Sequence, residues 1–386
     1  MSRAPAQPIA DGELRAKVVV PLAGRGYEVL VGPGLLGDAI APIEARLGRA
    51  RCAVVTDSNV AACHLPQLET LLRAHGLFAG TVVLTPGEAT KSFAHLARLC
   101  ERLLEMGLER RDLLIALGGG VVGDLAGFAA SILRRGIRYV QLPTSLLAQV
   151  DSSIGGKTAI NTPQGKNLVG SFHQPSLVLA DTQALATLPA REFRAGYVEA
   201  AKYALLGDAD YFAWLEHNQA AIFARDPARL CHAIASAVAG KARIVADDER
   251  ESGERMLLNL GHTFGHALEA WAGFSDRLLH GEAIAIGICL AFLLSAELGL
   301  AAEDGVARVE RHFSRLGLPT SIADIAGEPR PDVDTLLGLM GQDKKVADGR
   351  MALILVRGIG EAFVSRDVPN DALRSFLARQ AATPRP

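Results

Sequence analysis

The stretch Leu113–Ala130, LLIALGGGVVGDLAGFAA, decides the fold class. An apolar run is followed by three consecutive glycines and then by a helix-like segment of small residues, and Gly118, Gly120 and Gly123 satisfy the pattern G-x-G-x-x-G. Because glycine has no Cβ, the backbone N–H groups of such a turn and the helix N-terminus can approach a pyrophosphate. The stretch therefore predicts a strand, turn and helix of a dinucleotide-binding domain, although the acid expected about 20 residues later is missing.

Short β-branched runs alternate with helix-like segments up to about residue 190, which is typical of an α/β layer with parallel strands. Beyond that point Ala-rich segments of 3.6-residue period predominate, and only residues 351–365 indicate a late hairpin. We predict an α/β domain over 13–189 and a helical domain over 190–378. We expect the active site in the cleft between the two domains.

Composition narrows the function class. The chain of 386 residues carries 40 Lys and Arg against 42 Asp and Glu, a net charge of −2, and 49% hydrophobic residues. These values exclude a disordered chain and give no reason to expect nucleic acid or an anionic membrane as a partner. Five cysteines without a C-x-x-C pair favour reduced thiols over disulfides or a thiolate zinc site.

Targeting segments are not evident in the sequence. The N-terminus has no apolar leader, which predicts a cytoplasmic protein. The apolar stretch Ala283–Ala296 is shorter than the ~20 residues that span a bilayer, so we expect a buried helix there.

Polar residues at the ends of predicted strands are candidate ligand contacts in the first half. Asp57 and Asn59 follow one strand, and Glu88 and Lys91 follow another, at the carboxyl ends where open α/β sheets bind ligands. The segment Asp151–Thr158, DSSIGGKT, is similar to a phosphate-binding P-loop, but an aspartate occupies the position of its first glycine. A triphosphatase is therefore disfavoured. Donors remain in a glycine-punctuated loop that we expect to bind an anion: Lys157, Lys166 and Asn167.

Three histidines mark a possible metal site in the helical half. His262 and His266 are one helical turn apart, and His280 begins the next helical segment. Glu199 lies among small and apolar residues, where it either joins these histidines or pairs with Lys202 on the next turn. The residues alone do not choose three ligands from this set.

Taken in order, the glycine turn, the lysine loop, G-x-x-E-x-x-K and N-x-G-H-T-x-G-H resemble the 3-dehydroquinate synthase family. The resemblance runs from about Tyr27 to Ser365. Its most specific blocks are 118–130, 135–161, 165–175, 195–206, 255–269, 280–287 and the DKK triplet at 343–345. Two small departures, Ala159 and Val198, stand where the family commonly has Gly and Ala.

The resemblance implies roles for named residues. It assigns Zn²⁺, or Co²⁺, to Glu199, His262 and His280, and leaves His266 on the substrate side. It assigns NAD contacts to Asp57, Asn59, Glu88, Lys91, Gly119, Gly120, Asp124, Thr144, Ser145, Lys157, Lys166 and Thr187. It assigns contacts with the substrate, or roles in its reaction, to a further set: Lys157, Asp151, Asn167, Lys202, Lys241, Arg255, Asn259, His266 and one lysine of the DKK triplet, Lys344 or Lys345. Arg135 resembles an arginine that the family donates from a neighbouring subunit, which implies a homodimer.

The implied reaction converts 3-deoxy-D-arabino-heptulosonate 7-phosphate to 3-dehydroquinate and phosphate in the shikimate pathway. NAD is expected to oxidise and then re-reduce the substrate, so it is not consumed. Asp151 and His266 are candidates for moving hydroxyl protons, and the other residues position the substrate and stabilise charge.

Three other functions compete with this expectation. Other sugar-phosphate cyclases share the resemblance, but Arg255 and Asn259 suit a substrate carboxylate. An NAD- and metal-dependent polyol dehydrogenase leaves Lys157, Lys202 and Lys241 without a phosphate to bind. An NAD-sensing or metal-storage module needs neither a complete set of three zinc ligands nor these anion-binding residues.

Overall fold

The computed structural model describes residues 12–250, 253–327, 329–342, 346–347 and 350–382. The chain forms two compact units. The first comprises Met1–Pro189 and Gln219–Arg250, and the second Ala190–Asn218 and Glu251–Pro386. The segment Gln219–Arg250, which we placed in the helical domain, groups with the first unit because helix α7 (Pro227–Asp247) packs on strands β1 and β2. The domain limits 13–189 and 190–378 stay a prediction.

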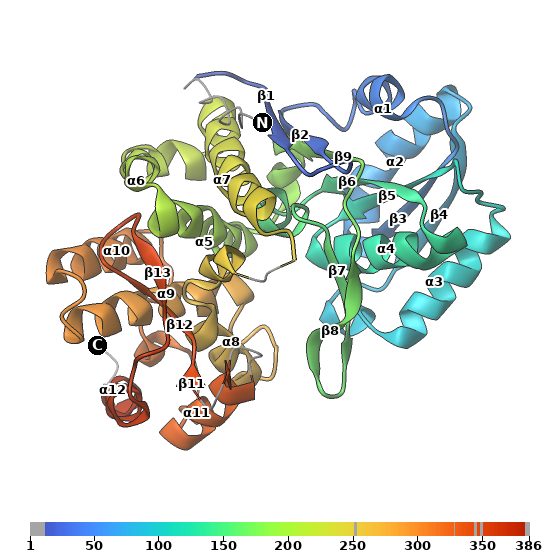
Figure 1. Cartoon of the computed structure of the whole chain (residues 1–386). Helices are drawn as coiled ribbons and strands as arrows, with labels where there is room; N and C mark the ends of the chain where they lie inside the picture. The colour runs from blue at the N-terminus through green and yellow to red at the C-terminus, as the bar shows by residue number, and fades with distance from the viewer. Residues whose placement is uncertain (1–11, 251–252, 328, 343–345, 348–349, 383–386) are drawn as a thin grey trace. The chain divides into compact units, whose positions relative to one another are not determined.

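A seven-stranded sheet forms the centre of the first unit (Figure 1). Only β1 runs antiparallel, paired with β2, and every other pairing in this sheet is parallel. The spatial order is β1 (Ala16–Val20), β2 (Tyr27–Gly32), β9 (Leu177–Asp181), β6 (Arg138–Pro143), β5 (Leu113–Gly118), β3 (Cys52–Asp57) and β4 (Phe78–Leu84). The predicted parallel α/β layer is confirmed.

Helices cover both faces of this sheet, and strand alternation explains why. In β3, Ala53 and Val55 face the core beneath α3 (Phe93–Glu105) and α4 (Gly120–Ile132). Cys52 and Val54 face the opposite core beneath α1 (Ile40–Leu47) and α2 (Ser58–Ala74). Because successive side chains of a strand point to opposite faces, a strand covered on both sides must be apolar throughout.

Two local predictions differ from the structure. The stretch 52–60, CAVVTDSNV, predicts a strand that runs into a loop, but the strand leads directly into α2: the Asp57 carboxylate accepts from the backbone N–H groups of Asn59 and Val60 and caps that helix. The loop expected around Lys157 and Lys166 is an antiparallel hairpin that projects from the sheet, β7 (Lys157–Thr162) and β8 (Gly165–Phe172) (Figure 1). Its glycine content and polar residues concealed the strand period.

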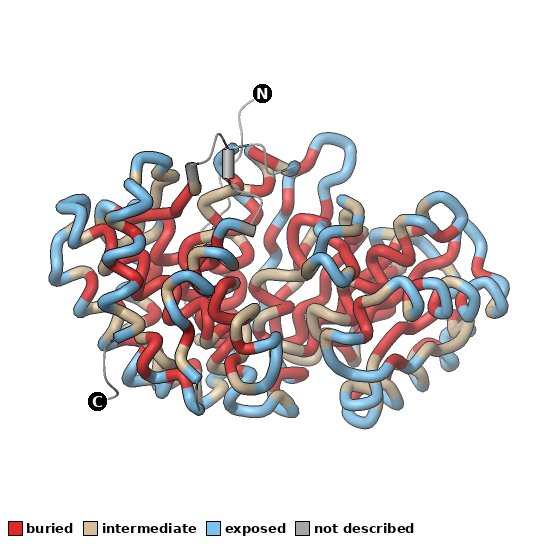
Figure 2. The backbone as a smooth tube through the Cα atoms, turned by 90° about the horizontal axis from the view of Figure 1, so that it is seen from below, coloured by how far each residue is buried: buried red, intermediate tan, exposed pale blue. Residues whose placement is uncertain are grey.

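Short helical turns complete the first unit. They are η1 (Glu88–Thr90), η2 (Leu133–Arg135), the π-helical turn η3 (Ala148–Ser152) and η4 (Thr182–Thr187). In both units the buried segments lie inside and the exposed turns lie at the periphery (Figure 2).

The second unit is mainly helical, as predicted. It contains α5 (Ala190–Gly207), the first part of α6 (Ala209–Phe223), η5 (Glu254–Asn259), α8 (His262–Trp271), α9 (His280–Glu297), α10 (Glu303–Arg315), η6 (Ile322–Asp324), α11 (Val333–Gln342) and α12 (Asn370–Ala382). Two hairpins accompany them: β10 (Val346–Ala347) with β11 (Arg350–Met351), and the expected late hairpin, β12 (Leu353–Val356) with β13 (Ala362–Ser365).

Helix α9 is the central helix of this unit, and α5, α8, α10 and β12 pack against it. By length and composition alone it could cross a membrane, but 72% of it is buried inside the protein. The predicted buried helix is confirmed. The five cysteines are free thiols, three of them buried.

Candidate active site

The glycine turn of the first unit separates two kinds of glycine. A Cβ on Gly118 would lie 2.6 Å from Val122 Cβ, and one on Gly127 would lie 2.5 Å from Thr158 Cγ2, so these positions are glycine because the fold leaves no room. A Cβ on Gly119 would lie 3.4 Å from Ser145 Oγ, an ordinary contact. Internal packing therefore does not require glycine at position 119, at the start of α4. A pyrophosphate site would explain this glycine, because a position without a side chain lets the backbone N–H groups approach the phosphates.

A buried ion network lies beside this turn. The Lys91 ammonium, 4% exposed, donates to Asp124 Oδ2 at 2.7 Å and to Asn167 Oδ1, and it lies 3.5 Å from Glu88 Oε1. Burial alone would lower the pKa of Lys91, but the carboxylates of Asp124 and Glu88 outweigh it and raise that pKa. The lysine is therefore a fixed cation.

The same network ties the β7–β8 hairpin to the sheet. Asn161 donates through its amide to Glu88 Oε1 at 2.8 Å, and its side-chain oxygen accepts from the backbone N–H of Asn167 at 2.9 Å. Asn167 adopts a left-handed φ of 56°, which Asn tolerates better than most residues. Sequence reasoning missed Asn161, although its place at the strand end beside Lys166 and Asn167 was a usable signal.

A second cation of the first unit comes from α7. The Lys241 ammonium, 7% exposed, donates to both the backbone carbonyl and the carboxylate of Asp151 at 2.8 Å. Asp151, the residue that argued against a P-loop, thus forms an ion pair with Lys241. Thr187 bonds to His64 Nε2 at 2.9 Å, and Thr144 donates its N–H to the carbonyl of Gly118.

In the second unit, close helix packing brings distant residues together. A Cβ on Gly281 would lie 1.9 Å from the carbonyl oxygen of Ala195, so only glycine lets α9 lie this close to α5. A Cβ on Gly261 would meet Ile288 at 2.6 Å, and its φ of +79° also favours glycine. The adjacent residues are His280 and His262, so these contacts place both imidazoles near Glu199 of α5.

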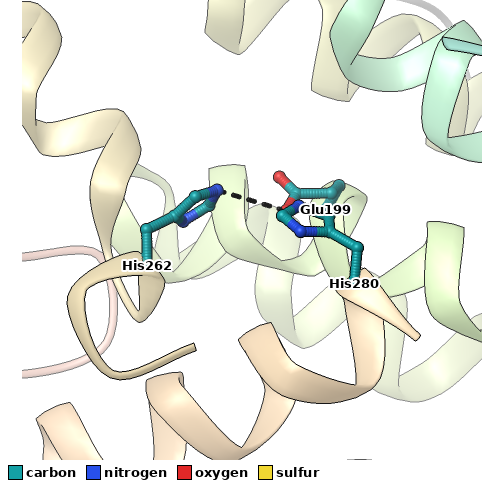
Figure 3. A group of neighbouring side chains, drawn as sticks. All are labelled: Glu199, His262 and His280. Atoms are coloured by element: carbon teal, nitrogen blue, oxygen red, sulfur yellow. Dashed lines mark ion pairs between the residues drawn. The ribbon is translucent and has the colours of Figure 1, made fainter. Parts of the chain in front are cut away.

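Glu199, His262 and His280 converge (Figure 3). One carboxylate oxygen, Glu199 Oε1, lies 3.6 Å from His262 Nε2 and 3.5 Å from His280 Nε2, and the other, Oε2, pairs with the Lys202 ammonium. Glu199 therefore both approaches the histidines and pairs with Lys202, the two alternatives that the sequence left open. Ligand bonds of about 2.0–2.2 Å in tetrahedral geometry put neighbouring ligand atoms about 3.4 Å apart. The spacing and the donor set, one carboxylate and two imidazoles, fit a divalent metal with an open position.

A further carboxylate contacts this cluster. Glu269, 5% exposed, accepts from His280 Nδ1 at 2.8 Å. Burial alone would lower the pKa of His280, but Glu269 and Glu199 outweigh it and raise that pKa to about 10. A metal ion would have to displace this proton, because histidine ligates as the neutral imidazole. Sequence reasoning missed Glu269, although it lies two helical turns after His262 on the same face.

The remaining candidates divide between the units. The substrate-side residues Arg255, 1% exposed, Asn259 and His266 lie in the second unit, as does Lys202. The first unit holds the other candidates: Asp57, Asn59, Glu88, Lys91, Gly119, Gly120, Asp124, Arg135, Thr144, Ser145, Asp151, Lys157, Lys166, Asn167, Thr187 and Lys241. Lys344 and Lys345 lie outside the described residues.

Comparisons with known proteins agree on one family. The family model for the 3-dehydroquinate synthase N-terminal region matches residues 81–195, and that for its C-terminal region matches 196–346. A 3-dehydroquinate synthase of Paracoccus denitrificans is 57% identical over 362 residues, 94% of this chain and 98% of that protein.

Solved structures show the same architecture. The 2-epi-5-epi-valiolone synthase ValA from Streptomyces hygroscopicus, with NAD⁺ and Zn²⁺ bound, is 32% identical with a TM-score of 0.82, covering 92% of this chain and 96% of that one. A 2-deoxy-scyllo-inosose synthase complexed with carbaglucose-6-phosphate, NAD⁺ and Co²⁺ is 25% identical with a TM-score of 0.84, covering 95% and 100%.

Proposed function

We propose, because this chain belongs to the 3-dehydroquinate synthase family, that it converts 3-deoxy-D-arabino-heptulosonate 7-phosphate to 3-dehydroquinate and phosphate. It would thus be a carbon–oxygen lyase of the shikimate pathway. The observation that carries the proposal is the convergence of Glu199, His262 and His280, a metal-ligand set, in a chain whose other unit holds a dinucleotide-type glycine turn.

NAD and a divalent metal are the cofactors of this proposal. When bound, NAD would accept a hydride from the substrate carbon that bears the hydroxyl group and later return it, and the metal would polarise the oxygen of that hydroxyl group. Glu199, His262 and His280 would hold the metal, as Zn²⁺ or Co²⁺. Gly119 and Gly120 would contact the pyrophosphate, with Lys91, Asp124 and Glu88 beside them as a fixed charge network.

Fixed cations would bind the anionic substrate, which carries a carboxylate and a phosphate. Lys241 and Lys202 are buried and each pairs with a carboxylate, so their ammonium groups are oriented before the substrate arrives. Lys157, Asn167, Arg255 and Asn259 complete the proposed anion contacts. Asp151 and His266 would move hydroxyl protons, and Asp151 is held for this by its contact with Lys241.

We further propose a cytoplasmic homodimer in which Arg135 reaches the partner's site. Support comes from the backbone: Arg134, Arg135 and Gly136 have φ values of 52°, 66° and 112°. Non-glycine residues in this region carry strain of about 1–3 kcal/mol each, which persists where function requires it. Removing the Arg135 side chain should then impair turnover without changing metal binding.

The test is to supply the metal-loaded protein with the heptulosonate phosphate and trace NAD. Phosphate should be released in large molar excess over NAD without accumulation of NADH, because the hydride returns to the substrate. NADH accumulating in stoichiometric amounts would instead identify a dehydrogenase.

A cyclase acting on a sugar phosphate without a carboxylate is the second candidate, favoured by the likeness to the valiolone synthase. The buried Arg255 argues against it, because a guanidinium at this proposed anion contact suits the substrate carboxylate that the second candidate's substrate lacks. Turnover of a seven-carbon ketose phosphate lacking the carboxylate, at a rate equal to that of the heptulosonate, would favour the second candidate.

A further inference from the structure

We propose that Glu269 is a positioning residue for the metal site: it fixes the His280 imidazole so that Nε2 is presented to the ion. The inference rests on the proposed function, because it concerns the metal that this function requires. Glu269 is not among the residues that the sequence or the family resemblance assigned.

The contacts of the two histidines are parallel. His280 Nδ1 lies 2.8 Å from Glu269 Oε2, and His262 Nδ1 lies 3.2 Å from the carbonyl oxygen of Leu260. A carbonyl oxygen accepts only, and so does an ionised carboxylate, so Nδ1 must be the donor in both contacts. Each imidazole is then left with Nε2 as its metal-binding atom, and both Nε2 atoms face Glu199 Oε1.

The His280 ring needs a restraint from Glu269 more than the His262 ring needs one from the Leu260 carbonyl, because His280 is more exposed. The His280 side chain is 33% exposed, against 11% for His262, so packing restrains its ring less. A buried carboxylate, 5% exposed, supplies the missing restraint. It also makes the imidazole more basic and hence a better ligand, as outer carboxylates do in other histidine–metal sites.

A rival explanation makes Glu269 a metal ligand itself. Ligand atoms of His266, Glu269 and His280 also lie within 4.8 Å of one another. That arrangement would use His280 Nδ1, the atom already bonded to Glu269, and His266, which is exposed. The two explanations predict different metal stoichiometries and different behaviour of a glutamine variant.

The experiment measures Zn²⁺ and Co²⁺ affinity of the full chain by competition with a chromophoric chelator, and the visible absorption of the Co²⁺ form. The variants are Glu269→Ala and Glu269→Gln. Glutamine keeps the shape and an oxygen that accepts from Nδ1. Glu282→Gln is the matched control, because Glu282 is a carboxylate in the first turn of α9, the helix of His280, and it accepts from Arg191 and from the backbone N–H of Leu279 but not from the His280 ring. His280→Ala is the reference for loss of a ligand.

Glu269→Ala should weaken metal binding about 10- to 100-fold, as for other outer-shell partners, and shift the Co²⁺ spectrum. Glu269→Gln should retain most of the affinity, and Glu282→Gln should match the unmodified protein. Should Glu269→Ala bind the metal within about twofold of the unmodified protein, with an unchanged spectrum, the proposal is overturned. A second equivalent of metal, lost equally in Glu269→Gln and Glu269→Ala, would overturn it in favour of direct ligation.

The same data separate this proposal from the proposed function. If His280→Ala binds metal as tightly as the unmodified protein, the metal assignment and the function that needs it both fail. If His280→Ala loses the metal while Glu269→Ala does not, only the positioning role fails. If Glu269→Ala is not folded, the Glu269→Gln spectrum still decides. The proposal expects a shift of the Co²⁺ absorption, because a neutral amide oxygen makes the His280 imidazole less basic than a carboxylate does, whereas a carboxylate with no role at His280 would leave the absorption unchanged.

Discussion

The two units use charge in opposite ways. In the first unit the charged groups satisfy one another: Lys91 contacts Asp124 and Glu88, and Lys241 contacts Asp151. In the second unit one carboxylate oxygen faces two imidazole nitrogens at 3.5 and 3.6 Å, a spacing that a cation would fill. The charged side chains of the first unit thus hold one another in place, whereas those of the second unit converge on a position that suits a metal ion.

The comparison predicts the largest effect at the convergent histidines. His262→Ala should abolish high-affinity metal binding and lower kcat/KM by at least about 10³-fold, because the metal supplies several kcal/mol of transition-state stabilisation. His266→Ala, one helical turn away, should bind the metal normally and lose only turnover. Metal content and steady-state kinetics of both variants check this, and loss of metal from His266→Ala would reverse the assignment.

The buried network of the first unit should matter next, and for stability. Lys91→Met leaves the Asp124 and Glu88 carboxylates without their cation, which should cost about 3 kcal/mol in the free energy of unfolding. The matched change Arg102→Ala removes an exposed partner of Glu105 and should cost less than about 0.5 kcal/mol. Urea unfolding measures both. Equal costs would show that the buried network is not distinct from a surface ion pair.

Acid should weaken the second unit through His312. This imidazole is 3% exposed beside Tyr197, and burial lowers its pKa from 6.5 to about 4. The unfolded chain therefore binds a proton that the folded chain excludes, so stability is lost as the pH falls from 6.5 towards 4. The full loss is about 3 kcal/mol, at 1.36 kcal/mol per unit of pKa.

Fluorescence can follow this transition, because both tryptophans, Trp214 and Trp271, lie in the second unit. His312→Gln keeps a polar partner for Tyr197 but cannot titrate, so its unfolding free energy should depend less on pH over that interval. An identical pH dependence in the two proteins would contradict the explanation.

The smallest effects should separate the two kinds of glycine in the turn. Gly118→Ala should lower stability by about 1–3 kcal/mol, because its Cβ would lie 2.6 Å from Val122 Cβ. Gly119→Ala should change stability by less than about 1 kcal/mol yet weaken NAD binding. Thermal unfolding measures the stability of both variants, and NAD titration measures their affinity for NAD. Undiminished NAD affinity in Gly119→Ala would contradict the proposal that the backbone at Gly119 contacts the pyrophosphate.

Much of the first unit could be predicted because its signals are local. Apolar runs such as Leu113–Gly118 predict strands buried on both faces, and the glycine turn is contiguous in the chain. The β7–β8 hairpin could not be predicted the same way, because the contacts that hold it join distant residues. Lys91 bonds to Asn167 and Asn161 to Glu88, 76 and 73 positions apart, and Ile160 packs into the core beside α4.

The sequence by itself determined the order of elements, the family and a short set of candidate ligands. Only the tertiary structure decided how those candidates meet: that Glu199 directs one oxygen to the histidines and the other to Lys202, and that Glu269 bonds to His280. The physical reason is that hydrophobic period and turn chemistry act over a few residues. Convergence of α5, α8 and α9 depends on backbone contacts at Gly261 and Gly281, which no local pattern encodes.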